Sequence, residues 1–118
     1  MKNNIQISVK TNFLPKESKF HNENIWSYFI TISNKGYSPA KLLSRHWLIT
    51  DGDGESSEVI GDGVVGTQPV IQPNQSFEYN SFVTSKTDSS MMSGNYTMQN
   101  ELGEKFVAII PPFYLNKV

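Results

Sequence analysis

Apolar and polar residues alternate one by one along several stretches of this 118-residue chain. The clearest stretch is 26–32, where every second residue is Trp, Tyr or Ile. Shorter stretches with the same spacing of apolar residues occupy 5–9, 77–79 and 106–110. A period of two is typical of a strand that packs one face on a core and turns the other face to water. We therefore predict a β-strand at each of these places.

Residues that favour turns separate the predicted strands. They are Asn34-Lys35-Gly36, Asp51-Gly52-Asp53-Gly54, Pro73-Asn74 and Leu102-Gly103. Glycine and asparagine permit positive φ, and proline presets the backbone of a turn. No window of the sequence shows apolar residues at a sustained helical spacing. Several short strands with frequent turns predict an all-β protein, namely an antiparallel two-sheet β-sandwich.

The predicted strand at residues 40–50 differs from the others because both of its faces carry large side chains. These are Leu43, Arg45, Trp47 and Ile49 on one face, and Leu42, His46 and Leu48 on the other. A strand that is apolar on both faces is usually central in its sheet and covered on both sides. We therefore expect Trp47 to point into the core, and Arg45 and His46 to be partly buried beside bonding partners.

Length and composition narrow the class of protein. A chain of this size is expected to form one domain, residues 1–118, that folds without a metal or a disulfide. The lack of cysteine excludes disulfides and thiolate ligands, and it fits a cytoplasmic location. The net charge is −1, and the single arginine and scattered lysines argue against a nucleic-acid partner. No apolar run resembles a signal peptide or a membrane span, so we expect no membrane partner.

A long segment at 61–75 carries two prolines and three glycines, which argues against regular structure there. Gly61, Gly63 and Gly66 have the G-x-G-x-x-G spacing of dinucleotide-binding loops. That fingerprint requires a helix whose N-terminal amides receive the pyrophosphate, and no helical pattern follows here. Two interpretations stay open. The glycine amides form a nest for an anion, or the glycines adopt backbone conformations that other residues cannot reach.

The same segment contains apolar residues that must either fold back on the domain or face a partner. Val64 and Val65 lie between glycines, so we expect at least one of them to project outward as part of a contact surface. The alternative is a loop that only covers a sheet edge. The candidate contact residues are Gly61, Gly63, Val64, Val65, Gly66, Gln68 and Pro69.

Some residues resemble the ligands of a metal site or the residues of a catalytic site, but the sequence around them does not match such a site. Asp51, Asp53 and Glu55 alternate like the start of a calcium loop, but predicted strands flank them instead of helices, which favours a solvated hairpin turn. His21 and His46, the only histidines, lie on different segments. No serine has the context of a nucleophile elbow. We expect no metal site, no cofactor and no enzyme activity.

Four motifs follow one another along the chain. They are Ser44-Arg45-His46-Trp47, Gly61-Asp62-Gly63-Val64-Val65-Gly66, Met92-Ser93-Gly94-Asn95-Tyr96 and Ile110-Pro111-Pro112-Phe113. In this order, and over nearly the whole chain, they resemble the bacterial ApaG family. The sequence departs from the family pattern at Thr67, where an acidic residue is usual, and at Phe82, where glycine is usual.

The resemblance implies an immunoglobulin-like or fibronectin type III-like sandwich. It also implies a place in a family linked to cobalt resistance, magnesium efflux and the binding of pyrophosphate-containing nucleotides. Related domains in eukaryotic proteins resemble protein-interaction modules. Together with the lack of catalytic residues, this predicts a non-catalytic binding or regulatory module, with a protein partner as the leading hypothesis.

The alternative hypothesis is a sensor of nucleotides or pyrophosphate, alone or with a divalent cation, that uses the Gly61–Gly66 loop. Arg45 is then the candidate anion contact, since its guanidinium suits phosphate oxygens. Arg45 has a structural alternative as well, which is a bond to the carboxylate of Asp51 or Glu58 or to several backbone carbonyls. The sequence leaves both hypotheses open.

Overall fold

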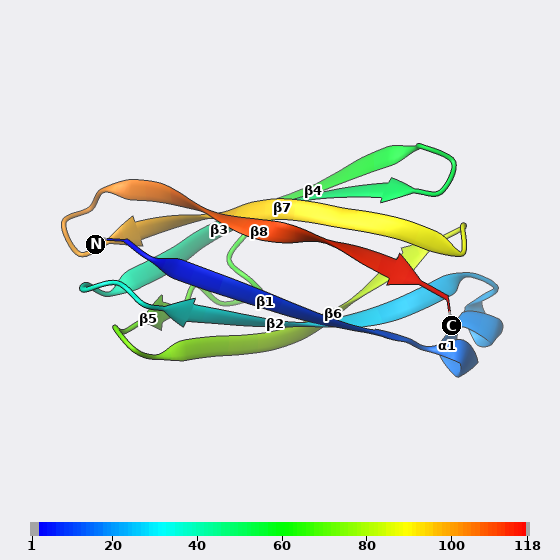
Figure 1. Cartoon of the computed structure of the whole chain (residues 1–118), viewed down its shortest axis with the longest axis horizontal. Coiled ribbons are helices and arrows are strands. Elements are labelled where there is room, and N and C mark those ends of the chain that lie inside the picture. The colour runs from blue at the N-terminus through cyan, green and yellow to red at the C-terminus, as the bar shows by residue number, and fades with distance from the viewer. Residues whose placement is uncertain (1–2, 118) are drawn as a thin grey trace.

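Two antiparallel β-sheets pack face to face in the computed structural model, which describes residues 3–117 (Figure 1). The elements are β1 (Ile5–Phe13), α1 (Pro15–His21), β2 (Asn24–Asn34), β3 (Ala40–Asp51), β4 (Ser56–Asp62), β5 (Val70–Ile71), β6 (Ser76–Ser85), β7 (Ser89–Asn100) and β8 (Lys105–Asn116). One sheet has the order β1-β2-β6, and the other has the order β4-β3-β7-β8 with β5 also beside β3. The predicted sandwich is confirmed. Its finer likeness to immunoglobulin and fibronectin type III domains stays a prediction.

Side chains from both sheets meet in one hydrophobic core. The alternating apolar residues of β2 are all buried in it, as their period of two predicted. Trp47 is also buried, because β3 lies between β4 and β7 and turns this side chain toward the opposite sheet. Its ring packs edge-on against Tyr28 and Phe113, with centroid distances of 5.6 and 5.8 Å. The predicted central position of Trp47 is therefore confirmed.

The prediction that β3 is covered on both faces is wrong. Its outer face is open: Leu48 is 37% exposed, while Ile60 on β4 and Ile109 on β8 are 70% and 67% exposed. A β-bulge between Leu42 and Ser44 also reverses the expected face of Leu42, which is buried in the core together with Trp47. The extra residue of a bulge shifts the alternation by one position, and residue periodicity does not show this.

The short helix α1 was not expected from the sequence. It begins with Pro15, a residue suited to the first helical position, and ends at Asn22 in the left-handed conformation. Its one buried residue is Ser18, whose hydroxyl donates to the Leu14 carbonyl at 2.7 Å and accepts from the Ile25 amide at 2.8 Å. A helix held by a serine has no apolar stripe that a periodicity search detects. No helix among residues 3–117 is long and apolar enough to cross a membrane.

Candidate functional site

Arg45 fastens the end of β4 to β3. Its Nη1 donates to the carbonyl oxygens of Asp62 at 3.1 Å and Gly63 at 3.0 Å. The guanidinium also lies against Gly61, its neighbour across the two strands, where a Cβ would come within 2.9 Å of Nη2. The structural alternative with several carbonyls thus describes the position of Arg45. The hydrogen bonds hold Nη1 of the guanidinium against backbone carbonyls.

The two carboxylates proposed as partners of Arg45 bond elsewhere. Glu58 lies 3.2 Å from Nε2 of His46, and both side chains are about half exposed on the outer face of the sheet. Asp51 accepts hydrogen bonds from the backbone amides of Asp53 and Glu55, at 2.9 and 3.0 Å. The turn at 51–55 is therefore the predicted solvated hairpin, closed by an aspartate side chain.

Residues 64–67 form a tight hairpin, and its two central residues both have positive φ. Val64 and Thr67 exchange two backbone hydrogen bonds, of 2.8 and 3.0 Å. Between them Val65 has φ 42° and Gly66 has φ 80°. This pair of positive values is the mark of a type I′ turn, whose usual central residues are Asn and Gly. We call residues 61–70 the hairpin segment.

The hairpin segment is anchored to β3 at the β-bulge. Both the Gly63 amide and the Gln68 side chain donate to the carbonyl of Leu43, each at 2.8 Å. The Leu42 amide donates to the carbonyl of Pro69 at 2.9 Å. Beyond Pro69, β5 pairs with the first residues of β3. Gly63, Gln68 and Pro69 therefore complete the hydrogen bonding of β3 beyond the end of β4. This agrees with the interpretation that the loop covers a sheet edge.

The two valines of the hairpin segment have opposite environments. Val64 is fully buried in the core, so the expectation that its side chain belongs to a contact surface is wrong. Val65 is 58% exposed at the tip of the turn. A β-branched residue at positive φ is a conformational outlier, and outliers of this kind are frequent at functional sites. The sequence predicted that at least one valine projects outward, and only the turn geometry identifies it as Val65.

Several amides of the predicted anion nest are engaged within the chain. The amides of Gly63, Val64 and Thr67 all donate to backbone carbonyls, and the exposed carboxylate of Asp62 lies next to them. Nη1 of Arg45 is engaged as well, with the carbonyls of Asp62 and Gly63. The glycines are instead explained by their conformations, since Gly63 and Gly66 have φ of 61° and 80°.

A tyrosine pair lies in the core beneath Arg45. The hydroxyl groups of Tyr79 on β6 and Tyr96 on β7 hydrogen bond at 2.5 Å and so join the two sheets. Burial raises the pKa of Tyr79 to about 12 and also raises the pKa of Tyr96. Both phenols therefore stay protonated at neutral pH. Their arrangement ties the sheets together and provides no ionised base.

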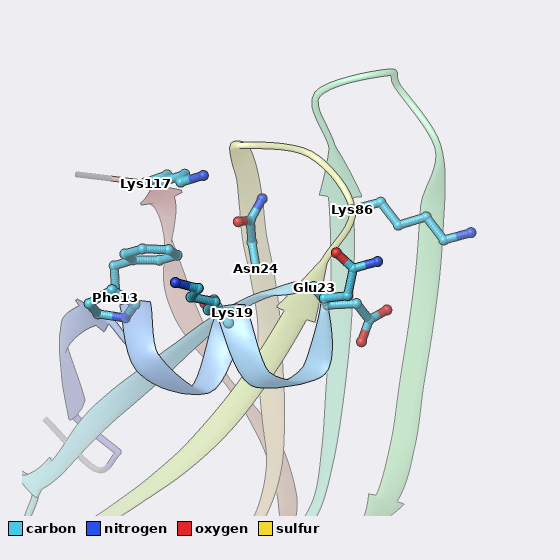
Figure 2. A pocket seen from close by; sticks show the side chains of 9 residues that line it. Phe13, Lys19, Glu23, Asn24, Lys86 and Lys117 are labelled. Atoms are coloured by element: carbon cyan, nitrogen blue, oxygen red, sulfur yellow. The ribbon is translucent and has the colours of Figure 1, made fainter.

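A cavity lies beside α1 (Figure 2). It has a volume of about 430 Å³ and is lined by Phe13, Pro15, Ser18, Lys19, Asn22, Glu23, Asn24, Lys86 and Lys117. Three lysines reach it from separate segments. Figure 2 shows Lys19 and Lys117 near the Phe13 ring, while Lys86 extends away from them. Asn24 is held by Asp88, to which its amide donates at 3.1 Å.

Histidine and carboxylate side chains come together only in pairs. Among residues 3–117, no group of three or more His, Cys, Asp or Glu side chains is placed to hold a metal ion. His21 lies on α1 and His46 on β3, where it faces Glu58. The expected lack of a resident metal or cofactor stays a prediction.

Comparison with known proteins decides the family. The model of the ApaG domain matches residues 15–100. The chain belongs to the ApaG family. The Protein ApaG of Rhodopseudomonas palustris (strain TIE-1) is 47% identical over 113 residues, which cover 95% of this chain and 87% of that protein. The Protein ApaG of Azotobacter vinelandii (strain DJ) is 49% identical over 112 residues, covering 94% and 89%.

A solved structure agrees with this ApaG fold. The crystal structure of a Bordetella pertussis protein described as ApaA is 36% identical and superposes with a TM-score of 0.93. The match covers 98% of this chain and 94% of the other. The match of the family model includes Arg45 and the whole hairpin segment. We call the cavity beside α1 the lysine cavity, and two of its lining residues, Phe13 and Lys117, lie outside the match.

Proposed function

We propose that this ApaG domain is a non-catalytic binding module that contacts a protein partner through the tip of the hairpin segment. The observation that carries the proposal is the position of Val65, an exposed apolar side chain held at positive φ on an anchored turn. Loops presented by a rigid scaffold are the usual place of binding residues. An anchored loop also loses little conformational entropy when a partner binds.

The conformation of Val65 supports a contact role over a packing role. Its side chain fills no part of the core, in contrast to that of Val64. A non-glycine residue in a strained backbone region costs on the order of 1–3 kcal/mol. Asparagine at this position of a type I′ turn would avoid much of that cost. A strained, exposed valine thus supports the proposed contact with a partner.

The bonding of four polar side chains supports a non-catalytic role. Tyr79 and Tyr96 share a hydrogen bond in the core and stay protonated at neutral pH. Arg45 bonds to backbone carbonyls, and His46 bonds to Glu58 on an open sheet face. None of these side chains lines the cavity beside α1.

We expect Val65→Asn to stabilise the fold and to weaken partner binding. Asparagine suits the first central position of the turn, so the melting temperature should rise by a few degrees. The apolar contact is lost at the same time. The measurement combines a thermal melt with photo-crosslinking in cell extract, in which a photoreactive amino acid replaces Val65 and the adducts are identified by mass spectrometry.

The control places the same photoreactive group at Leu102, which is 81% exposed at the tip of the β7–β8 hairpin. We expect discrete adducts from position 65 that excess unlabelled wild-type protein competes away and excess Val65→Asn protein does not. Equal adducts from both positions would indicate general adhesion and contradict the proposal. A lower melting temperature for Val65→Asn would show that Val65 packs on the domain.

A second candidate function is the binding of pyrophosphate or a pyrophosphate-containing nucleotide, alone or with a divalent cation. The lysine cavity favours it, because Lys19 and Lys117 could both contact one anion, whereas the amides of Gly63, Val64 and Thr67 are engaged. Glu23 also lines this cavity, and its carboxylate would repel a free anion. An anion that carries a divalent cation would be repelled less. The anion would then lie near α1 and not at the Gly61–Gly66 loop.

A thermal-shift panel tests this second candidate with pyrophosphate, ATP, MgCl₂ and CoCl₂. A site filled to a hundred times its dissociation constant adds about 2.7 kcal/mol, which should raise the melting temperature by several degrees. We expect the double variant Lys19→Gln, Lys117→Gln to lose any anion shift and Val65→Asn to retain it. A flat panel for the wild type would rule out this candidate and leave the protein-binding proposal untouched.

A further inference from the structure

Strand β4 forms an uncovered edge of the five-stranded sheet. It packs almost entirely against β3, and in Figure 1 it is the outermost strand of its sheet. Every residue of β4 except Gly61 is exposed, including the central Val59 and Ile60. The pairing with β3 is unbroken over its whole length. An edge of this kind presents a row of unpaired backbone groups to the solvent.

The opposite edge of the same sheet is protected, and β4 is not. Proteins commonly block an edge strand with proline, lysine or a β-bulge. β8 contains Pro111 and Pro112 beside a bulge in its pairing with β7. β4 has the sequence Ser-Ser-Glu-Val-Ile-Gly-Asp, with no proline, no lysine and no bulge. Its edge is therefore able to accept another strand.

Two hydrogen bonds at the ends of β4 show which backbone groups are free. The Asp51 amide donates to the Glu55 carbonyl at 2.9 Å, and the Gly63 amide donates to the Leu43 carbonyl at 2.8 Å. Bonded and non-bonded pairs alternate along an antiparallel ladder. Counting inward from either end, the residues bonded to β3 are Ser57, Val59 and Gly61. Those with amide and carbonyl groups at the free edge are Ser56, Glu58, Ile60 and Asp62. Of these groups, the Asp62 carbonyl already accepts from Nη1 of Arg45.

We propose that β4 pairs antiparallel with β4 of a second copy of this chain, about a two-fold axis at Val59. In this register the facing pairs are Ser56 with Asp62, Ser57 with Gly61, Glu58 with Ile60 and Val59 with itself. All the edge-facing amides then form hydrogen bonds, and the Asp62 carbonyl accepts from the facing Ser56 amide in addition to Arg45. No carboxylate faces another carboxylate, and the two Val59 side chains meet on one face of the extended sheet.

Neighbouring registers are disfavoured because they place carboxylates opposite one another and because they pair fewer residues. An axis at Glu58 places this carboxylate opposite its own copy, and an axis at Ile60 places Glu58 opposite Asp62 on both sides. Like charges directly opposite one another on a sheet are destabilising. Either shift also shortens the paired region. A single pair of edge strands buries less surface than a standard stable interface, so we expect a weak, concentration-dependent dimer.

The decisive experiment is disulfide trapping with Val59→Cys. The chain has no cysteine, so the introduced thiol is the only one. Facing residues of a non-bonded pair have Cα atoms about 4.5 Å apart, which lies within the range that a disulfide spans. Mild oxidation should therefore convert Val59→Cys to a covalent dimer. Ser57→Cys is the matched control on the same face of the strand, where the two thiols would lie about 13 Å apart.

A second measurement separates edge pairing from contact between side chains. Sedimentation velocity over a concentration series should show self-association of the wild type. Ile60→Pro removes an edge-facing amide and leaves the bonds to β3 in place, so it should be monomeric with an intact thermal melt. Ile60→Thr keeps that amide and should still associate.

Three outcomes would overturn the proposal. One is a wild type that stays monomeric throughout the series while Val59→Cys crosslinks no faster than Ser57→Cys. Another is loss of association in Ile60→Thr, which would assign the contact to the side-chain face. A third is protection of the β4 amides from hydrogen exchange only when a different protein is added, which would assign the edge to another occupant. None of these measurements involves the hairpin tip.

Discussion

Replacing Trp47 by alanine should lower the free energy of unfolding by about 3–5 kcal/mol, enough to unfold much of the protein at physiological temperature. The side chain is 2% exposed and lies at the centre of an aromatic cluster formed with Tyr28, Tyr96 and Phe113. Its removal leaves a large cavity that both sheets line. Urea denaturation followed by circular dichroism measures the loss.

Two control variants locate the cause of this loss. Leu48→Ala changes the adjacent residue on the open outer face and should cost far less. The Trp47 Nε1 group is buried without a hydrogen-bond partner among the described residues. Trp47→Phe removes this unpaired group and keeps a ring, so it should also cost less than Trp47→Ala. A Trp47→Ala protein that melts within a degree or two of the wild type would contradict the central place of Trp47.

Gly63→Ala should destabilise the protein by about 3 kcal/mol, because it adds a steric overlap to an unfavourable backbone conformation. A Cβ at position 63 would overlap the carbonyl oxygen of Thr67, which belongs to the backbone and closes the hairpin. The residue also has φ of 61°, in the left-handed region. The expected result is a lower melting temperature, measured together with faster hydrogen exchange at the Gly63 amide that bonds to β3.

Gly66→Ala is the matched control for this prediction. Gly66 has φ of 80°, but no atom lies within 4 Å of the place where its Cβ would stand. Only the conformational cost remains, about 1–2 kcal/mol. Equal losses in the two variants would show that backbone conformation alone explains the glycines, and that the contact between Gly63 and Thr67 contributes nothing.

Much of the fold follows from the order of residues alone. Strand β2 was predictable because its alternation is regular and one of its faces is apolar. The hairpin at 51–55 was predictable because its Asp and Gly residues strongly favour a turn over a strand or a helix. The resemblance to the ApaG family was also visible in the sequence, through motifs in the expected order, and the match of the domain model confirms it. Local patterns carry this information because strands and turns are specified within a few residues.

The candidate site was predictable in location and not in detail. The glycines and prolines of the hairpin segment indicated an irregular loop with an outward valine. The sequence did not distinguish Val64 from Val65, because both have the same side chain and lie between glycines. The choice depends on the bonds from Gly63 and Gln68 to the Leu43 carbonyl, which orient the turn against β3. Those partners are about twenty residues away in the chain.

Tertiary structure alone decided which apolar surfaces are covered. The sequence determined that β3 carries large residues on both faces and that β4 contains Val59 and Ile60. It did not determine that one face of β3 stays open or that β4 has a neighbour on one side only. The physical reason is that a side chain specifies its preference for burial, whereas burial requires a second surface. This chain provides one opposing sheet, so only one face of β3 is covered.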